Sequence, residues 1–251
     1  MNILICIKRV PVVGRKIQFT ADAQEIDTSS MGFAISPHEG CAVEEAVRLI
    51  EKHGGAATVL TLGPAEAEEQ LRDAMAIGVD RALHLQTDGR EFAPIATANA
   101  IVDAVRADGT PFDLLLFGNE AADTGDYQVG VRVAHALGLP CVTGVTALEI
   151  HDGRATAQRQ VPGGVEIYDV ALPAVIAVKD GINFPRFPSL PGRLKAKKKP
   201  LVTIEPPWQN GGLQKTSLLN PPEETHQVVI LGKGPEAAPK VVDLLAELGL
   251  L

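Results

Sequence analysis

The feature of this sequence that most constrains its fold is an alternation of strand-like and helical patterns over the first 140 residues. Short apolar runs alternate with stretches of helical spacing that often close on glycine. The strand-like runs are Ile3 to Val10, ATVLTLG at 57–63, RALHLQ at 81–86 and FDLLLFG at 112–118. The helical stretches are 38–52, 64–78, 92–109 and 127–138. This repeated order predicts an α/β fold with a doubly wound, mostly parallel sheet and helices on both faces.

The pattern changes after residue 142. Residues 145–178 contain strand-like runs joined at His151-Asp152-Gly153 and at Val161-Pro162-Gly163-Gly164, which are turn compositions typical of hairpins. We therefore expect a small antiparallel extension to follow the parallel body. A short early pair, KIQFT at 16–20 and EID at 25–27, predicts another hairpin.

The last 45 residues show little regular pattern. The exceptions are QVVILG at 227–232 and the amphipathic run PEAAPKVVDLLAELGLL at 235–251. We predict a body at 1–200 and a C-terminal arm at 201–251, which either packs on a partner subunit or forms a disordered or self-wrapped terminus.

Composition limits the class of protein. A chain of 251 residues with 45% hydrophobic and 22% charged residues is long enough for one large α/β domain with an appendage. The net charge of −8 argues against general nucleic-acid binding, and no apolar run or leader predicts a membrane span or secretion, so we expect a bacterial cytoplasmic protein. Cys6, Cys41 and Cys141 are widely spaced without a CxxC pair, which predicts packed thiols rather than a disulfide or zinc site.

A nucleotide site is expected at the point where the strand order reverses, because open parallel sheets bind ligands beyond the carboxyl ends of their strands there. The relevant loops are KRVPVVGRK at 8–16 and GNEAADTGD at 118–126. Gly118 and Gly125 permit close backbone approach, and Thr124 or Asp126 could cap a helix that starts near Tyr127. No GxGxxG or GxxxxGK motif is present, so an ordinary turn with a good N-cap is the alternative.

Searches for catalytic motifs find none. The sequence contains neither GxSxG nor HExxH, and its six histidines are scattered. Glu44, Glu45 and Arg48 are spaced for ordinary pairing on a helix surface. We therefore assign no catalytic residue and no metal site, and leave open whether the chain is an enzyme.

A basic, proline-rich stretch, NFPRFPSLPGRLKAKKKP at 183–200, contrasts with the acidic chain. Its four prolines predict an extended or turning loop rather than a helix or strand. Leu190 lies in the middle, followed by Arg193, Lys195 and the three lysines at 197–199. A solvated basic linker is one interpretation, and a docking loop is the other.

Several separated stretches together resemble the beta subunit of electron transfer flavoproteins. They are ICIKRVP, AVEEAVRLIEK, TLGPAEAEEQLRDAMAIGVDRA, GNEAADTGDYQVG, LPAVIAVKDGINFPRFPSL and AKKKP, and they cover residues 1 to about 200. The resemblance implies an adenine nucleotide alpha-hydrolase-like fold. It also implies a heterodimer with an alpha subunit, which contributes most of the site for a redox-active FAD.

The resemblance further implies a second nucleotide, AMP, in the switch-point cleft of this chain. The positions carried over are Cys6, Ser36, Pro37, His38, Glu39, Leu62, Gly118, Asn119, Glu120, Ala121, Ala122, Asp123, Thr124, Gly125, Asp126, Tyr127, Gln128 and Val129. Many AMP-binding members have Asn-Pro where this chain has Ser36-Pro37, and the series from Asp123 to Val129 partly resembles electron-bifurcating members that hold a second FAD. AMP is the first expectation and a second FAD the alternative.

The resemblance also implies the remaining roles. Val13 and His38 would lie near the flavin, although neither matches the aromatic residues common in the family. Leu190 would insert into a pocket on an acyl-CoA or related dehydrogenase, with Lys195, Lys197 and Lys198 behind it. Electrons would then pass to a quinone-linked oxidoreductase, as in fatty acid beta-oxidation. Electron bifurcation and a non-redox nucleotide sensor are the alternative functions.

Overall fold

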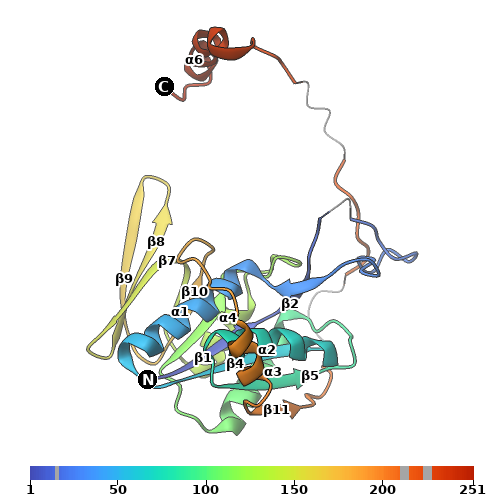
Figure 1. Cartoon of the computed structure of the whole chain (residues 1–251), viewed down its shortest axis with the longest axis vertical. Helices are drawn as coiled ribbons and strands as arrows, with labels where there is room; N and C mark the ends of the chain where they lie inside the picture. The colour runs from blue at the N-terminus through green and yellow to red at the C-terminus, as the bar shows by residue number, and fades with distance from the viewer. Residues whose placement is uncertain (15–16, 210–214, 223–227) are drawn as a thin grey trace.

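The fold is built around one large sheet in a computed structural model that describes residues 1–14, 17–209, 215–222 and 228–251. The sheet has nine strands in the order β11-β5-β4-β1-β6-β10-β7-β8-β9 (Figure 1). Its strands are β1 (Asn2–Ile7), β4 (Ala56–Gly63), β5 (Arg81–Gln86), β6 (Leu114–Gly118), β7 (Cys141–His151), β8 (Arg154–Val161), β9 (Gly164–Ala171), β10 (Ala174–Val178) and β11 (Leu201–Ile204). A separate antiparallel pair consists of β2 (Arg9–Pro11) and β3 (Phe33–Ile35).

Within the described residues, five helices connect strands and a sixth lies in the C-terminal arm. They are α1 (Pro37–His53), α2 (Glu68–Ile77), α3 (Pro94–Asp108), α4 (Val129–Leu137), α5 (Leu190–Ala196) and α6 (Ala238–Glu247), with 3-10 turns η1 (Ala65–Ala67) and η2 (Gly234–Ala237). The predicted alternation is thus confirmed as far as β7. Within the described residues, no helix combines the length and the apolar character needed to span a membrane.

The strand order reverses beside β1. The chain moves outward from β1 through β4 to β5, then returns to β6 on the other side of β1, and all of these neighbours pair in parallel. The switch point therefore lies between the carboxyl ends of β1 and β6. This is the doubly wound arrangement that the sequence predicts.

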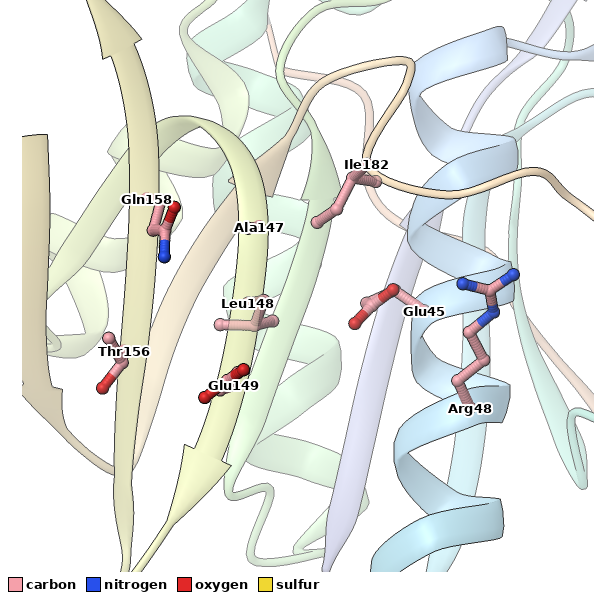
Figure 2. Close-up of a pocket in the computed structure, with 8 residues that line it drawn as sticks. All are labelled: Glu45, Arg48, Ala147, Leu148, Glu149, Thr156, Gln158 and Ile182. Carbon is pink, nitrogen blue, oxygen red and sulfur yellow. The ribbon is translucent and has the colours of Figure 1, made fainter. Parts of the chain in front are cut away.

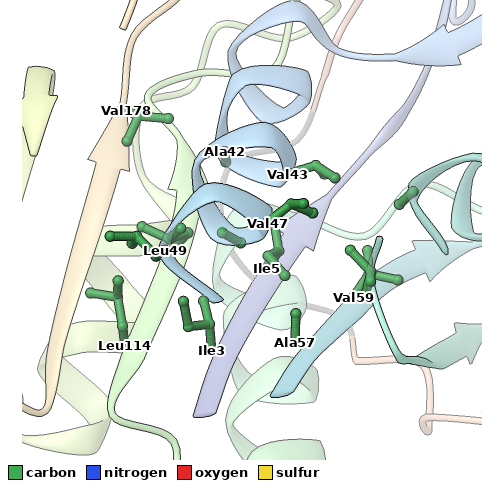
Figure 3. Close-up of a cluster of buried hydrophobic side chains, with 14 of the residues drawn as sticks. Ile3, Ile5, Ala42, Val43, Val47, Leu49, Ala57, Val59, Leu114 and Val178 are labelled. Atoms are coloured by element: carbon green, nitrogen blue, oxygen red, sulfur yellow. The ribbon is translucent and has the colours of Figure 1, made fainter. Parts of the chain in front are cut away.

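Alternating side chains of β1 supply two hydrophobic cores. Ile3 and Ile5 pack with α1 and α2 on one face, where Val43 and Val47 meet the sheet (Figure 3). Leu4 packs with α3 and α4 on the other face. Because both faces are covered, β1 is apolar at nearly every position, which is typical of a central parallel strand.

The antiparallel prediction for residues 145–178 is right for three strands and wrong for the last. β7, β8 and β9 form the expected meander, which extends away from the body (Figure 1). β10 instead returns to the body and pairs in parallel with both β6 and β7. Its five residues are all buried, so burial on both faces decides its place.

Two further segments near the expected end of the body differ from the prediction. β11 pairs in parallel with β5, which extends the sheet to Ile204, beyond the expected boundary at residue 200. The stretch predicted to be a loop contains α5, which begins at Leu190 itself. The Ser189 hydroxyl caps it by accepting the N–H of Gly192 at 3.1 Å, and Pro191 is tolerated because first-turn N–H groups need no helical partner.

The two other local predictions have mixed outcomes. The early hairpin is reduced to one bridge between Phe19 and Ile26, and Lys16 lies outside the described residues. The QVVILG run, for which the sequence predicts no particular element, forms neither helix nor strand at 228–232, and Gln227 is also outside the described part. The amphipathic run does form α6, which stands apart from the sheet with Val241 and Val242 exposed (Figure 1).

Candidate functional site

The switch point brings together the end of β1, the first turn of α1 and the end of β6. The backbone N–H of Lys8 donates a 2.6 Å hydrogen bond to the Glu39 carboxylate. Gly118 lies directly against this side chain, since a Cβ at that position would be 2.6 Å from Glu39 Cγ. The absence of a side chain at Gly118 therefore lets three elements converge.

Glu39 is a buried carboxyl group, with 7% of its residue surface exposed. Burial raises its pKa to about 8, an effect that the hydrogen bond from Lys8 only partly offsets. Burial, together with the nearby Glu39, also raises the pKa of the Cys6 thiol. The floor of the site therefore holds a carboxyl group that is largely protonated at neutral pH and a thiol that stays neutral.

The loop after β6 is anchored at its base and exposed at its tip. Asn119 accepts the N–H of Gly144 at 2.7 Å through its side-chain oxygen, and the Ser36 hydroxyl accepts the N–H of Ala122 at 3.2 Å. The ammonium of Lys8 pairs with Asp123 at 2.7 Å. Residues 122–127 are exposed. The loop thus presents its backbone and acidic side chains to solvent from a fixed base.

The helix after this loop starts later than predicted and lacks the predicted cap. α4 begins at Val129 rather than near Tyr127, and no side chain caps it, so neither Thr124 nor Asp126 has the expected role. The Gln128 side chain does not cap the helix either, because its carboxamide oxygen accepts a hydrogen bond from the Arg132 guanidinium at 2.8 Å. The first-turn N–H groups of α4 therefore have no side-chain acceptor, which is the property that makes a helix start an anion site.

Backbone strain shapes the turn into α4. Gly125 has a φ of 58°, and Tyr127 has a φ of 56°, a conformation that a residue with a Cβ rarely adopts. A hydrogen bond to Glu120 raises the pKa of the Tyr127 phenol. The surrounding structure therefore holds the backbone of Tyr127 in a left-handed conformation.

The structure brings five of the predicted nucleotide-site residues together. Contacts or hydrogen bonds link Ser36, Glu39, Gly118, Ala122 and Asp123 around the switch point. Lys8 completes the cluster and is absent from the predicted set, although its place directly after the first strand was a signal for it.

Other predicted positions lie at the margin of this cluster. Leu62 and Val129 are partly buried against the core on the α3 and α4 side, and Pro37 is exposed. His38 lies 3.9 Å from Glu120 through Nε2, while its buried Nδ1 has no hydrogen-bond partner among the described residues. Val13, the other position expected near a flavin, is 48% exposed.

The predicted docking residues are accessible. Leu190 is 72% exposed at the start of α5, and Lys195, Lys197 and Lys198 are exposed beyond it. The leucine is therefore not packed into its own chain.

A different hollow of about 220 Å³ lies between α1 and the β7–β8 hairpin (Figure 2). Glu45 points into the space between the helix and β7, and its carboxylate accepts a 2.9 Å hydrogen bond from Asn183. Burial raises the pKa of Glu45. This carboxyl group has a structural partner, and it lies away from the switch point.

The cysteines and acidic residues make no metal centre in the described part of the chain. Cys6 and Cys41 are buried free thiols, and Cys141 is partly buried. The prediction of packed thiols is confirmed for these three residues.

These features define an open, doubly wound α/β protein with a candidate ligand cleft at its switch point. Comparison with known proteins identifies the family to which the chain belongs. The sequence model of the electron transfer flavoprotein domain matches residues 25–208. The chain belongs to the electron transfer flavoprotein family, whose function is to carry electrons and whose members bind flavin.

Relatives in three organisms support this assignment. The chain is 39% identical over 207 residues to the electron transfer flavoprotein subunit beta of Bacillus subtilis, covering 82% of this chain and 79% of the relative. It is 38% identical over 208 residues to the subunit beta of Syntrophomonas wolfei, covering 81% and 79%. It is 35% identical over 212 residues to a mitochondrial subunit beta of Oryza sativa, covering 82% of each chain.

Proposed function

We propose that this chain is the beta subunit of a heterodimeric electron transfer flavoprotein working in a bacterial cytoplasm. In this role it supplies a nucleotide cleft, part of the flavin surroundings and a docking segment. The observation that carries the proposal is the exposure of Leu190. Its side chain is 72% exposed, although the helix that it begins packs against the body. An apolar side chain held out in this way suits short-lived docking by an electron carrier.

The partner subunit would be the alpha subunit, with the C-terminal arm packing on it. α6 supports this proposal because its apolar residues, including Val241, Val242 and Leu244, have no cover from the body. The start of this arm does contact the body: Lys215 pairs with Glu91 at 2.7 Å, and the Leu218 N–H donates to the Ala23 carbonyl at 2.8 Å. The arm thus leaves the body from a fixed point and ends in an amphipathic helix.

The switch-point residues fit an adenine nucleotide. The uncapped start of α4 provides backbone donors for a phosphate. Asp123 and Asp126 provide carboxylate acceptors of the kind that bind ribose hydroxyls. Lys8 offsets the charge of Asp123. AMP is the proposed nucleotide, and the adenosine part of a second FAD would use the same groups.

FAD, shared with the alpha subunit, would supply the redox chemistry of the heterodimer. Val13 and His38 are the residues of this chain proposed to face it. His38 carries a buried ring nitrogen without a partner in the described residues, which is available to a bound group. No general acid or base of this chain is assigned to the transfer.

The proposed electron donors are acyl-CoA or related dehydrogenases, and the proposed acceptor is a quinone-linked oxidoreductase. Lys195, Lys197 and Lys198 support docking to acidic partners, since nearby cations accelerate encounter with a surface of opposite charge.

Cofactor analysis of the purified heterodimer tests the proposal. The chain is co-expressed with an alpha subunit from the same genome, and the nucleotides are released and quantified. One FAD and one AMP per heterodimer are expected. Two FAD would favour electron bifurcation, and a colourless monomer that releases ATP would favour a nucleotide sensor.

A further inference from the structure

Four exposed apolar side chains lie close together in sequence around α5. We call them the docking face: Phe184 (89% exposed), Phe187 (94%), Leu190 (72%) and Leu194 (57%). The two phenylalanines are more exposed than the leucine that the family resemblance singles out. Clustered exposed apolar residues of this size mark interaction surfaces.

An ion-pair clamp holds the first half of this segment against α1. The Arg186 guanidinium pairs with Glu44 at 3.0 Å and with Glu51 at 2.7 Å. Glu44 is 2% exposed at its side chain, and it also pairs with Arg48 at 2.8 Å. Burial by itself raises the pKa of Glu44, but the hydrogen bonds from Arg186 and Arg48 bring it below its usual value. Arg186 therefore fixes the chain between the two phenylalanines.

A second set of contacts holds α5 against α2. Arg193 pairs with Asp73 at 2.9 Å, and the Lys199 ammonium donates to the carbonyl of Val79 at 2.6 Å. Gly192 permits the close approach, since a Cβ there would lie 2.3 Å from the Ala76 carbonyl oxygen. The docking face is thus attached to the body at both ends.

The structure divides the six cations of this segment into two sets of three. Arg186, Arg193 and Lys199 are engaged by the body, as described above. Within the described residues, Lys195, Lys197 and Lys198 make no ion pair, and all three are exposed. No acidic residue lies between 183 and 200, so the surface beside the docking face is positive on a chain of net charge −8.

We propose that Phe184 and Phe187 bind the redox partner together with Leu190, and that Arg186 is the positioning residue that holds them outward. The partner is a dehydrogenase whose docking surface is an apolar groove with carboxylates along its edge, rather than a pocket for one leucine. This proposal rests on the proposed function, because it assumes that α5 docks a dehydrogenase.

The physical reason is preorganisation. Aromatic side chains bring a large apolar area with few rotatable bonds, and they are frequent among residues that dominate binding. A segment already held by ion pairs loses less conformational entropy when it binds. Charge complementarity between the free lysines and an acidic edge selects the partner.

The test measures electron transfer from substrate-reduced acyl-CoA dehydrogenase of the same genome to the intact heterodimer. The enzyme chosen is one for which the wild-type heterodimer gives a saturable rate. The double variant Phe184→Ala, Phe187→Ala is expected to raise KM for the heterodimer by about tenfold or more, with FAD content and kcat retained. Val202→Ala, another exposed apolar residue (49%), is the control and should leave KM unchanged.

The clamp is tested separately by hydrogen–deuterium exchange, which needs no partner. Arg186→Ala is expected to accelerate exchange of the backbone amides in residues 184–189, where the Arg186 N–H donates to Glu44, and to raise KM, while Arg186→Lys restores part of both. Unchanged exchange in this segment would overturn the positioning role.

The outcomes separate this inference from the proposed function. If Leu190→Ala raises KM and the phenylalanine variant does not, the inference is overturned and the proposed docking stands. If no dehydrogenase of that genome gives a saturable rate, the proposed function fails and the inference fails with it. If the phenylalanine variant separates from the alpha subunit on gel filtration, the aromatic residues belong to the subunit interface and the inference is wrong.

Discussion

The backbone N–H of Lys8 donates a 2.6 Å hydrogen bond to the carboxylate of Glu39, which joins the end of β1 to the first turn of α1. The position of Glu39 near the start of a helix favours its charged form, whereas burial favours its neutral form. Burial has the larger effect, because the pKa of Glu39 is raised to about 8. The switch point therefore holds an acidic group whose charge changes near neutral pH.

Glu39→Gln should change the pH dependence of stability. Because the folded pKa of about 8 exceeds the ordinary value of 4.5, the stabilisation from protonated Glu39 is complete below about pH 4.5 and is lost as the pH rises through 8. At about 1.4 kcal/mol per pKa unit the full shift corresponds to roughly 5 kcal/mol, and local solvation reduces it to about 1–3 kcal/mol. The neutral variant should therefore exceed the wild type in free energy of unfolding at pH 9 and match it near pH 5, as measured by urea unfolding. Parallel pH profiles would contradict the assignment.

Gly118→Ala should disturb the same site by steric contact. The new Cβ would lie 2.6 Å from Glu39 Cγ and 3.1 Å from His38 Cβ, so we expect a loss of about 1–3 kcal/mol in the free energy of unfolding. Gly40→Ala is the matched control. Gly40 lies in α1 with open space around it, and alanine there should raise stability by up to about 1 kcal/mol. Equal effects of the two substitutions would show that Gly118 has no packing role.

Asp108→Asn should lower stability at neutral pH. Asp108 receives two hydrogen bonds from Arg81, at 2.7 and 2.6 Å, and these hold the pKa of the carboxyl at about 2. The lowered pKa means that the stabilisation is present above about pH 4 and is lost as the pH falls through 2. We expect a loss of about 1–2 kcal/mol at pH 7 and a smaller difference at pH 2, measured by denaturant unfolding at each pH. A constant difference over this range would exclude the ion pair as its cause.

Leu190→Ala should slow electron transfer from the dehydrogenase while the flavin content stays unchanged. The side chain is 72% exposed, so its removal leaves no cavity in the fold. Loss of an anchor residue predicts an increase of about tenfold in KM for the heterodimer, measured by stopped-flow flavin reduction. Ile95→Ala, at a position 41% exposed on α3, serves as the control. An unaltered transfer rate would remove the docking assignment.

Deleting residues 233–251 should weaken binding to the alpha subunit without unfolding the body. α6 contributes no residue to either hydrophobic core, so far-UV circular dichroism should retain the signal of the sheet. The dissociation constant for the alpha subunit should rise by about tenfold or more. The full-length variant Val241→Asp, Leu244→Asp, at positions three residues apart on one face of α6, should reproduce the effect through the apolar face alone. Wild-type affinity in both proteins would favour a free terminus.

The alternation of periods was sufficient to predict the body of this fold from the sequence. Apolar residues at helical spacing between two strand-like runs predict that a helix connects the two strands. A helical crossover between neighbouring strands of one sheet places those strands in parallel. The same pattern predicts the position of the candidate cleft, because a doubly wound sheet binds ligands beyond the carboxyl ends of its strands where the strand order reverses.

Strand order beyond β7 was not readable from the sequence. β10 has a local pattern that fits either an antiparallel meander or a buried parallel strand, and only its burial between β6 and β7 distinguishes them. The prolines of the segment predict a loop because proline breaks helices, but Ser189 and Pro191 together form the helix-start signal with which α5 begins.

The sequence by itself determined the α/β class, the family and the positions of the candidate cleft and of the proposed docking segment, because these depend on periodicity and on motifs that are local in the chain. Tertiary structure alone decided that Glu39 is buried against Lys8 and Gly118, and that Arg186 reaches Glu44 across 142 residues. Burial and long-range ion pairing depend on which distant segments meet, and no local pattern encodes that contact.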